Sequence, residues 1–216
     1  MSSINYAKYI DNTLLAPQAT EAQIKALCKE SRKYNFASVC VNPCFVKLVN
    51  KELKGSKVKT CVVIGFPLGA NTTAVKVLEA KDAIKNGAQE LDMVVNIGKV
   101  KEGNYKYVTN EIAAIKKACG KKTLKVIIET CLLNDKEKVA LCKCIKQAKA
   151  DFVKTSTGFS TGGATVADIK LLKRTVKNSL LIKASGGVKI HEDMVKMIKA
   201  GANRIGTSRG VALIKE

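Results

Sequence analysis

Histidine is almost missing from this chain of 216 residues, since His191 is the only one. Proteins that use zinc for catalysis hold the ion with sets of histidine, cysteine and carboxylate ligands, usually with several histidines among them. His191 lies at the start of a helical pattern and has no second histidine to act with. The sequence therefore predicts no metal site and no metal-dependent mechanism.

Long apolar runs are missing as well. No stretch reaches 18 consecutive apolar residues, which excludes a membrane-spanning helix, and residues 1–8 show no basic segment followed by an apolar one. We therefore expect a cytoplasmic protein with no membrane partner, whose eight cysteines are reduced thiols. Cys142 and Cys144 lie in a helical pattern, where they serve as small apolar side chains. Cys40 and Cys131 fall near strand ends, from which a side chain can line a site.

Acidic residues and arginine are scarce beside lysine. The 38 basic and 18 acidic residues leave a net charge of +20, and the only arginines are Arg32, Arg174, Arg204 and Arg209. The lysines are scattered over expected helix faces and form no arginine-rich arm. This distribution is typical of a solvated surface and does not indicate specific nucleic-acid binding. A charge of this size does attract phosphorylated small molecules over long distances.

Strand-like and helical patterns alternate along the chain. Apolar strand candidates lie near residues 10, 39, 62, 93, 127, 153, 182 and 205, with a helical pattern between successive strands. Alternation of this kind predicts a parallel sheet covered by helices, and eight units in a chain of this length suit a closed (β/α)8 TIM barrel. An open doubly wound sheet is the alternative, but no Gly-x-Gly-x-x-Gly segment follows the early strands. Because no linker or low-complexity tract interrupts the pattern, we expect one α/β domain over residues 1–216.

Capping residues mark several helix starts. Thr20, with Gln23 three residues later, predicts a capping box, and Thr72 and Thr165 predict further N-terminal caps. The pattern also predicts a strand over residues 90–96 followed by a loop at Gly98, and another strand over residues 124–129.

Three charged residues stand inside strand patterns, namely Asp92, Lys154 and Lys183. Strand side chains alternate between two faces, so the apolar neighbours Leu91 and Ile182 should face the helices while the charged residues point into the barrel. Catalytic side chains of such barrels lie at the carboxyl ends of the strands. The alternative is that both lysines reach solvent at the rim and Asp92 pairs with one of them.

A poorly solvated lysine close to a second ammonium has a chemical use. Both influences favour the free amine of Lys154, which can attack a carbonyl and form a Schiff base. The resulting iminium withdraws electrons and lets an adjacent carbon–carbon bond break or form. Asp92 can hold Lys183 in its charged form and exchange protons with it directly or through water.

Glycine-rich turns follow the last strands. Gly186 and Gly187 come after the seventh strand, and Gly206 and Ser208 after the eighth, where barrels often bind phosphate through backbone N–H groups. Gly158, after the strand that carries Lys154, can add another such donor. The sequence therefore predicts a phosphate-binding site next to the lysine pair.

The chain resembles the deoxyribose-phosphate aldolases, a family of Schiff-base (class I) aldolases. The matching segments occur in family order and cover nearly the whole chain: Ile10-Asp-Asn-Thr-Leu-Leu15, Ser38-Val-Cys-Val-Asn-Pro43, Val63-Ile-Gly-Phe-Pro-Leu-Gly-Ala70, Glu90-Leu-Asp-Met-Val-Val-Asn-Ile-Gly98, Leu124-Lys-Val-Ile-Ile-Glu-Thr130, Asp151-Phe-Val-Lys-Thr-Ser-Thr-Gly158, Lys183-Ala-Ser-Gly-Gly-Val188 and Arg204-Ile-Gly-Thr-Ser208. The combination of Lys154-Thr-Ser-Thr-Gly158 and Lys183-Ala-Ser-Gly-Gly187 is highly specific.

This resemblance implies a (β/α)8 barrel and an aldehyde-lyase activity in deoxyribonucleotide and carbohydrate breakdown. The implied reaction is reversible cleavage of 2-deoxy-D-ribose 5-phosphate to D-glyceraldehyde 3-phosphate and acetaldehyde, without a cofactor. The resemblance gives Lys154 the role of the Schiff-base lysine, and it gives Asp92 and Lys183 the role of the proton-shuttling pair. The implied substrate-binding residues are Asp11, Thr13, Thr155, Gly158, Gly186, Gly187, Gly206 and Ser208. The sequence leaves a homo-oligomer open.

The chain departs from the family pattern at several positions. Asn12 and Ala16 stand where many members have histidine and lysine, Arg209 stands where a small residue is common, and the sequence ends at Glu216 without the tyrosine tail of some members. Two other functions remain open from sequence: an aldolase acting on another sugar phosphate, and a catalytically silent barrel that binds phosphate or nucleic acid.

Overall fold

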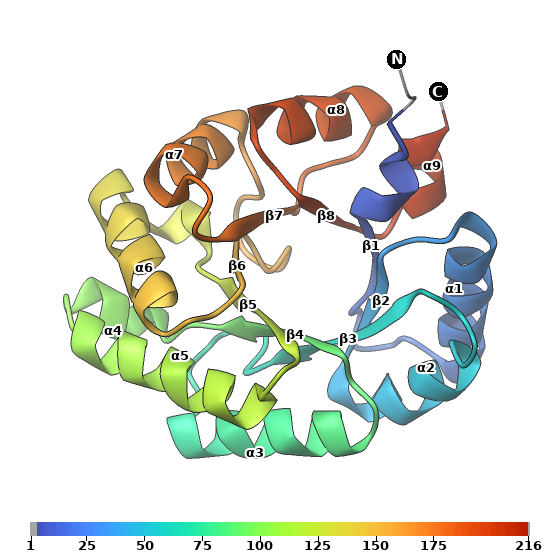
Figure 1. The fold of residues 1–216 in the computed structure, drawn as a ribbon, viewed down its shortest axis with the longest axis horizontal. Helices are drawn as coiled ribbons and strands as arrows, with labels where there is room; N and C mark the ends of the chain where they lie inside the picture. Colours follow the sequence, from blue (N-terminus) through green and yellow to red (C-terminus); the bar gives the residue numbers. More distant parts are fainter. Residues whose placement is uncertain (1–3, 216) are drawn as a thin grey trace.

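Eight parallel strands close into a barrel in the computed structural model, which describes residues 4–215. The strands follow one another around the barrel in chain order, and β8 pairs with β1 to close it. They are β1 (Ile10–Leu14), β2 (Ser38–Val41), β3 (Lys59–Ile64), β4 (Glu90–Val94), β5 (Thr123–Ile127), β6 (Phe152–Lys154), β7 (Leu181–Ser185) and β8 (Arg204–Thr207). The closed barrel confirms the predicted fold class and rules out the open sheet (Figure 1).

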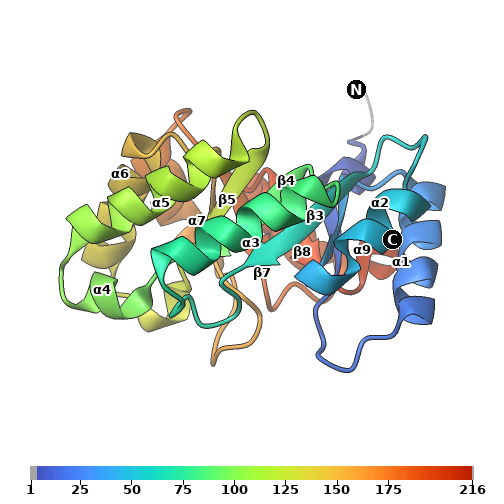
Figure 2. The same ribbon diagram turned by 90° about the horizontal axis from the view of Figure 1, so that it is seen from below.

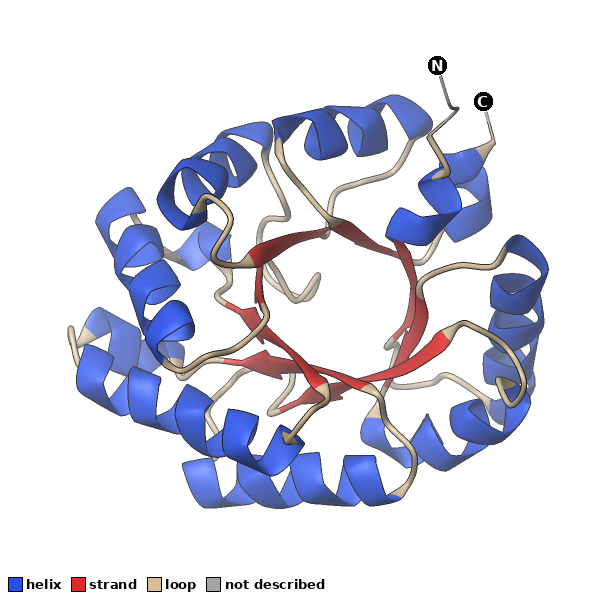
Figure 3. Ribbon diagram, viewed as in Figure 1, coloured by secondary structure: helices blue, strands red, loops and turns tan. Residues whose placement is uncertain are grey.

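Helices form a layer outside the strands, which Figure 3 shows as a blue ring around a red barrel. They are α1 (Glu21–Tyr34), α2 (Val46–Glu52), α3 (Thr73–Lys85), α4 (Ile97–Lys101), α5 (Tyr105–Cys119), α6 (Asp135–Gln147), α7 (Val166–Val176), α8 (His191–Ala200) and α9 (Gly210–Ile214). The view from the side shows α3 and α5 lying across the barrel wall (Figure 2). Within the described residues, none of these helices combines the length and the apolar character that a membrane crossing needs.

The predicted caps are present. Thr20 accepts a hydrogen bond from the backbone N–H of Gln23, whose side chain accepts one from the backbone N–H of Thr20, which completes the capping box. Thr72 and Thr165 cap α3 and α7 in the same way through their side-chain oxygens. Each such cap typically stabilises a helix by about 1 kcal/mol.

Two predicted strands are shorter than expected. The strand predicted over residues 90–96 ends at Val94, and the segment predicted as a loop around Gly98 begins α4, because the Asn96 side chain accepts a hydrogen bond from the backbone N–H of Lys99. The strand predicted over residues 124–129 ends at Ile127. Glu129 adopts a left-handed conformation (φ 52°), which cannot continue a strand.

The core has two layers. Leu91, Val153 and Ile182 are fully buried and belong to the large apolar cluster between the strands and the helices. Their neighbours in the strands point to the opposite face, into the barrel.

At the ends of the chain, α9 packs against β1 and against the 3₁₀ turn Tyr6–Tyr9. Glu216 lies outside the described residues.

Candidate active site

Three strands carry the charged residues that the sequence places inside the barrel. Lys154 is the last residue of β6 and is the register neighbour of Lys183 on β7, while Asp92 is the third residue of β4. Neighbouring residues on parallel strands project to the same face, so the two lysines lie side by side. Lys154 is only 2% exposed, and Asp92 and Lys183 are completely buried.

The Asp92 carboxylate is the common partner of the buried amines. Its Oδ2 accepts hydrogen bonds from Lys183 Nζ at 2.7 Å and from Lys154 Nζ at 2.9 Å, and its Oδ1 accepts one from Lys125 Nζ at 3.0 Å. The structure therefore brings Asp92, Lys154 and Lys183 into direct contact. Neither lysine reaches solvent at the rim, which removes the alternative in which both extend into water.

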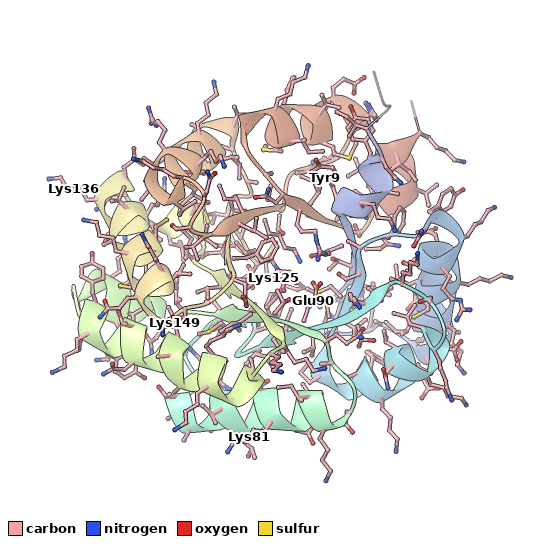
Figure 4. All side chains as sticks on the ribbon, viewed as in Figure 1. Tyr9, Lys81, Glu90, Lys125, Lys136 and Lys149 are labelled. Carbon is pink, nitrogen blue, oxygen red and sulfur yellow. The ribbon has the colours of Figure 1, made fainter. Side chains whose placement is uncertain are left out.

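The contacts continue into an ionic ring that we define by six residues: Asp11, Glu90, Asp92, Lys125, Lys183 and Arg204. Lys183 Nζ lies 2.6 Å from Asp11 Oδ2, Arg204 bridges Asp11 and Glu90, and Glu90 Oε2 accepts a hydrogen bond from Lys125 Nζ at 2.5 Å. Lys125 and Lys183 both bind Asp92, which closes the ring. In Figure 4, the labelled Glu90 and Lys125 lie in the centre of the barrel, whereas Lys81 and Lys136 project outward.

Sequence reasoning missed half of this ring. Lys125 stands between Leu124 and Val126 in a strand pattern. The same pattern identified Lys154 and Lys183, so it could also have identified Lys125. Glu90 and Arg204 are first residues of their strands and looked like ordinary rim positions. The structure shows that Arg204 and Glu90 contact each other through Nη2 and Oε1 at 2.8 Å.

Neighbouring charges decide the ionisation of the ring. Burial alone would raise the pKa of Asp92, but the ammoniums of Lys125, Lys154 and Lys183 hold that pKa well below its usual range. The pKa of Asp11 is lowered in the same way, against the effect of burial, by Lys183 and Arg204. Burial alone would lower the pKa of Lys183, but Asp11 and Asp92 raise it, so that its ammonium persists.

The lowered pKa of Asp11 predicts how an Asp11→Asn variant responds to pH. At pH 7 we expect the variant to lose about 3 to 5 kcal/mol of unfolding free energy, because the buried Lys183 and the partly buried Arg204 lose a charged partner. A carboxyl whose pKa is lower in the folded state stabilises the protein above its unfolded pKa of about 3.9, and this stabilisation disappears as the pH falls towards its folded pKa. The difference between wild type and variant should therefore shrink below about pH 4.

Urea unfolding of both proteins between pH 7 and pH 3, followed by circular dichroism, measures this difference. A difference that stays constant over the whole range would contradict the assignment of a charged Asp11 to the ring.

A cavity of about 570 Å³ opens at the carboxyl ends of the strands. This volume lies within the usual range for small-molecule sites. Seven predicted site residues line it: Lys154, Thr13, Gly158, Gly186, Gly187, Gly206 and Ser208. Arg209 and Lys189 line the same cavity and add positive charge to its glycine-rich side. The sequence prediction named neither of these two residues as part of the site.

Two predicted substrate-binding residues are buried behind the cavity wall. The Thr155 hydroxyl donates a hydrogen bond to the Ser185 carbonyl oxygen and accepts one from the Ser185 N–H, so it ties β6 to β7. The Asp11 carboxylate contacts Lys183 and Arg204 in the ionic ring. These contacts hold both residues next to the residues that line the cavity, and their role in substrate binding stays a prediction.

The glycines of this region allow segments to approach closely. A Cβ at Gly163 would lie 2.4 Å from the carbonyl carbon of Gly186, so only glycine lets the loops after β6 and β7 pack together. A Cβ at Gly206 would lie 2.3 Å from Ser185 Oγ and 3.0 Å from Lys183 Cε. Gly206 thus makes room for the Lys183 side chain, in addition to lining the cavity.

The fold and the site together define a (β/α)8-barrel enzyme whose buried amines meet a cavity at the carboxyl ends of the strands. Comparison with known proteins identifies the family. Residues 6–215 match the model of the family described as DeoC/LacD family aldolase. The chain belongs to this family, and it is an aldolase, a carbon–carbon lyase.

Several relatives are similar over almost their whole length. A deoxyribose-phosphate aldolase of Clostridium tetani is 58% identical over 97% of this chain and 97% of its own. One from Caldanaerobacter subterraneus is 55% identical over 100% of this chain and 94% of its own. Among solved structures, the tetrameric deoxyribose phosphate aldolase of Aeropyrum pernix has a TM-score of 0.90, with 36% identity over 96% of this chain and 88% of that one.

Proposed function

We propose that this chain reversibly cleaves 2-deoxy-D-ribose 5-phosphate to D-glyceraldehyde 3-phosphate and acetaldehyde through a Schiff base on Lys154. The observation that carries the proposal is the position of the Lys154 amine, which lines the cavity and lies 2.9 Å from Asp92 Oδ2. The names of the relatives from Clostridium tetani and Caldanaerobacter subterraneus support the same substrate.

The ionic ring is balanced in charge without Lys154. The three carboxylates of the ring, Asp11, Glu90 and Asp92, are matched by three cations, Lys125, Lys183 and Arg204. Lys154 is a fourth basic group on the same carboxylate oxygen that Lys183 already holds at 2.7 Å. The Asp92 carboxylate is thus shared among the amines of Lys125, Lys154 and Lys183.

In the proposed reaction, the Lys154 amine attacks C1 of the open-chain aldehyde to give a carbinolamine, which loses water to become an iminium. Acetaldehyde contains C1 and C2 of the sugar, so the bond that breaks is C2–C3. A base removes the proton of the C3 hydroxyl, the C2–C3 electrons move towards the iminium nitrogen, and glyceraldehyde 3-phosphate leaves. Protonation of the enamine at C2 and hydrolysis then release acetaldehyde and the free lysine.

The ring residues suit the proton transfers of this scheme. Asp92 faces the positive charge of the iminium and stabilises it, and Lys183 shares the same Oδ2 atom. A water in the cavity can carry protons between this pair and the substrate. The scheme uses only side chains of the chain and water, with no metal or organic cofactor.

The phosphate group would occupy the glycine-rich side of the cavity. Gly186, Gly187, Gly206 and Ser208 line that side, and the backbone N–H groups of such turns bind anions well. Lys154 lines the same cavity, so one bound sugar phosphate can contact both the glycine-rich side and the Lys154 amine. We expect Arg209 to add a charge–charge attraction to the phosphate, because it also lines this cavity.

Replacing Arg209 with serine tests its contribution. For an exposed ion pair worth up to about 1 kcal/mol, we expect KM for the phosphorylated sugar to rise about two- to fivefold, with kcat nearly unchanged. Activity on unphosphorylated 2-deoxyribose should not change. Lys81→Ser is the matched control, since Lys81 is exposed on α3 and the variant loses the same charge far from the cavity. An equal rise in KM in both variants would assign the effect to net charge.

Mass spectrometry of a reduced adduct tests the proposed function itself. The protein is incubated with acetaldehyde and sodium borohydride, digested and sequenced. We expect one stable two-carbon adduct on Lys154, and substrate profiling against other sugar phosphates should favour 2-deoxyribose 5-phosphate. An adduct on another lysine, or none, would overturn the mechanism.

The remaining parts of the proposal concern assembly and location. The tetrameric relative of Aeropyrum pernix supports a homo-oligomer, which light scattering of the purified chain would detect as a mass above that of one chain. The cytoplasmic location and the role in deoxyribonucleotide breakdown stay predictions. Fractionation of cells that produce the protein tests the first, and growth on deoxyribonucleosides tests the second.

A further inference from the structure

Two thiols lie in the barrel interior next to the ionic ring and have no part in the proposed reaction. Cys40 on β2 and Cys61 on β3 are register neighbours, so their side chains project side by side into the barrel. Both are free cysteines and completely buried. Asp92 lies on the neighbouring strand β4, and Cys61 Sγ donates a hydrogen bond to Asp92 Oδ1 at 3.2 Å.

The three side chains have the spacing of a set of metal ligands. One ligand atom from each of Cys40, Cys61 and Asp92 lies within 4.8 Å of the other two. A tetrahedral zinc ion, with Zn–S near 2.3 Å and Zn–O near 2.0 Å, needs ligand atoms roughly 3.5 to 3.8 Å apart. Small side-chain rotations would bring these atoms to that spacing. Three protein ligands leave the fourth position for water.

The chemistry of the ligands selects a soft cation. Thiolate sulfur prefers zinc, cadmium and related ions over magnesium or calcium. Binding breaks two S–H bonds, forms two metal–sulfur bonds and releases two protons to water, with no change in oxidation state. Two protons leave when one divalent ion enters, so the total charge beside Lys125, Lys154 and Lys183 stays the same. These basic side chains therefore do not oppose binding of the ion through a change in net charge.

We propose that Cys40, Cys61 and Asp92 form a binding site for a thiophilic divalent cation such as Zn²⁺, and that its occupation inhibits the enzyme. An ion on Asp92 Oδ1 competes with Lys125, which donates to that oxygen at 3.0 Å, and coordinates the carboxylate that Lys154 and Lys183 share. Cys40, Cys61 and Asp92 do not line the cavity themselves, but Lys154 does and it donates a hydrogen bond to Asp92. The inhibitory part rests on the proposed function, whereas binding stands by itself.

Cadmium is the probe for binding, since cadmium–thiolate bonds absorb in the near ultraviolet. The full chain, kept reduced with a phosphine, is titrated with Cd²⁺ by calorimetry and absorbance. We expect one tight site per chain, and at least about tenfold weaker binding in Cys61→Ser and in Cys40→Ser. Serine keeps the size and the hydrogen bonding of the side chain but removes the soft ligand. The matched control is the double variant Cys44→Ser/Cys131→Ser, which removes the two exposed thiols and should keep the tight site.

Activity provides the second measurement. Zn²⁺ or Cd²⁺ should inhibit the wild type in proportion to occupancy of the tight site, and a chelator should restore activity. Tight binding that survives in both Cys40→Ser and Cys61→Ser overturns the site, and full activity at full occupancy overturns the inhibition. If one serine variant does not fold, as judged by circular dichroism, the other gives the same test. A chain that binds Cd²⁺ at this site but forms no Lys154 adduct would refute the proposed function and leave the metal site standing.

Discussion

Replacing Lys154 with methionine is expected to abolish aldol cleavage, with a fall in kcat of about four orders of magnitude or more. Methionine fills a similar volume without an amine, so no covalent intermediate can form. The interior should tolerate the change, because Asp92 keeps its contacts with Lys125 and Lys183 at 3.0 and 2.7 Å. Cleavage is measured by coupling glyceraldehyde 3-phosphate formation to a dehydrogenase.

Lys183→Met is the companion variant for this experiment. It removes the other buried lysine on the Asp92 Oδ2 atom and leaves the proposed nucleophile in place. Borohydride reduction with acetaldehyde should still label Lys154 in this protein, although more slowly, and should leave Lys154→Met unlabelled. A folded Lys154→Met protein with wild-type activity would contradict the nucleophilic role.

The Asp92→Asn variant should lose both activity and stability. The buried side chains of Lys125, Lys154 and Lys183 would then share no carboxylate partner at this position. Breaking a buried ion pair from one side costs about 3 to 5 kcal/mol of unfolding free energy. Separately, loss of the proton-transferring carboxylate should lower kcat by a factor of about 10² to 10⁴.

Urea unfolding followed by far-ultraviolet circular dichroism measures the stability, since the chain has no tryptophan to report by fluorescence. Glu102→Gln serves as the control, because it breaks the exposed Lys99–Glu102 pair and should leave the midpoint unchanged. An Asp92→Asn protein as stable as the wild type would mean that the ring does not depend on this charge.

The fold could be predicted from the sequence because its signal is local and repeated. Each strand is a short apolar run bounded by glycine or polar residues, and caps such as Thr20 and Thr72 mark where helices begin. The errors fell at strand ends. Asn96 starts a helix by capping it and Glu129 turns the chain with a positive φ, and neither effect follows from the apolar pattern.

The site was predictable only in part. Strand alternation indicates which side chains enter the barrel, so it could bring Asp92, Lys154 and Lys183 together. It does not give the stagger of the strands, which decides that Arg204 meets both Asp11 and Glu90 across the barrel interior. Nor does it give the contact of the Thr155 hydroxyl with the Ser185 backbone, and the part of Thr155 in substrate binding stays a prediction.

The ionic ring has a consequence for how the chain reaches its native state on the ribosome. Its three acids lie on β1 and β4, but two of its three cations, Lys183 and Arg204, lie on β7 and β8. A nascent chain that has emerged only as far as β6 would enclose Asp11, Glu90 and Asp92 with Lys125 and Lys154 alone, and without Arg204 to join Asp11 to Glu90. Such a partial barrel gains little from closing early, so synthesis of the last two strands sets the moment at which the interior can seal.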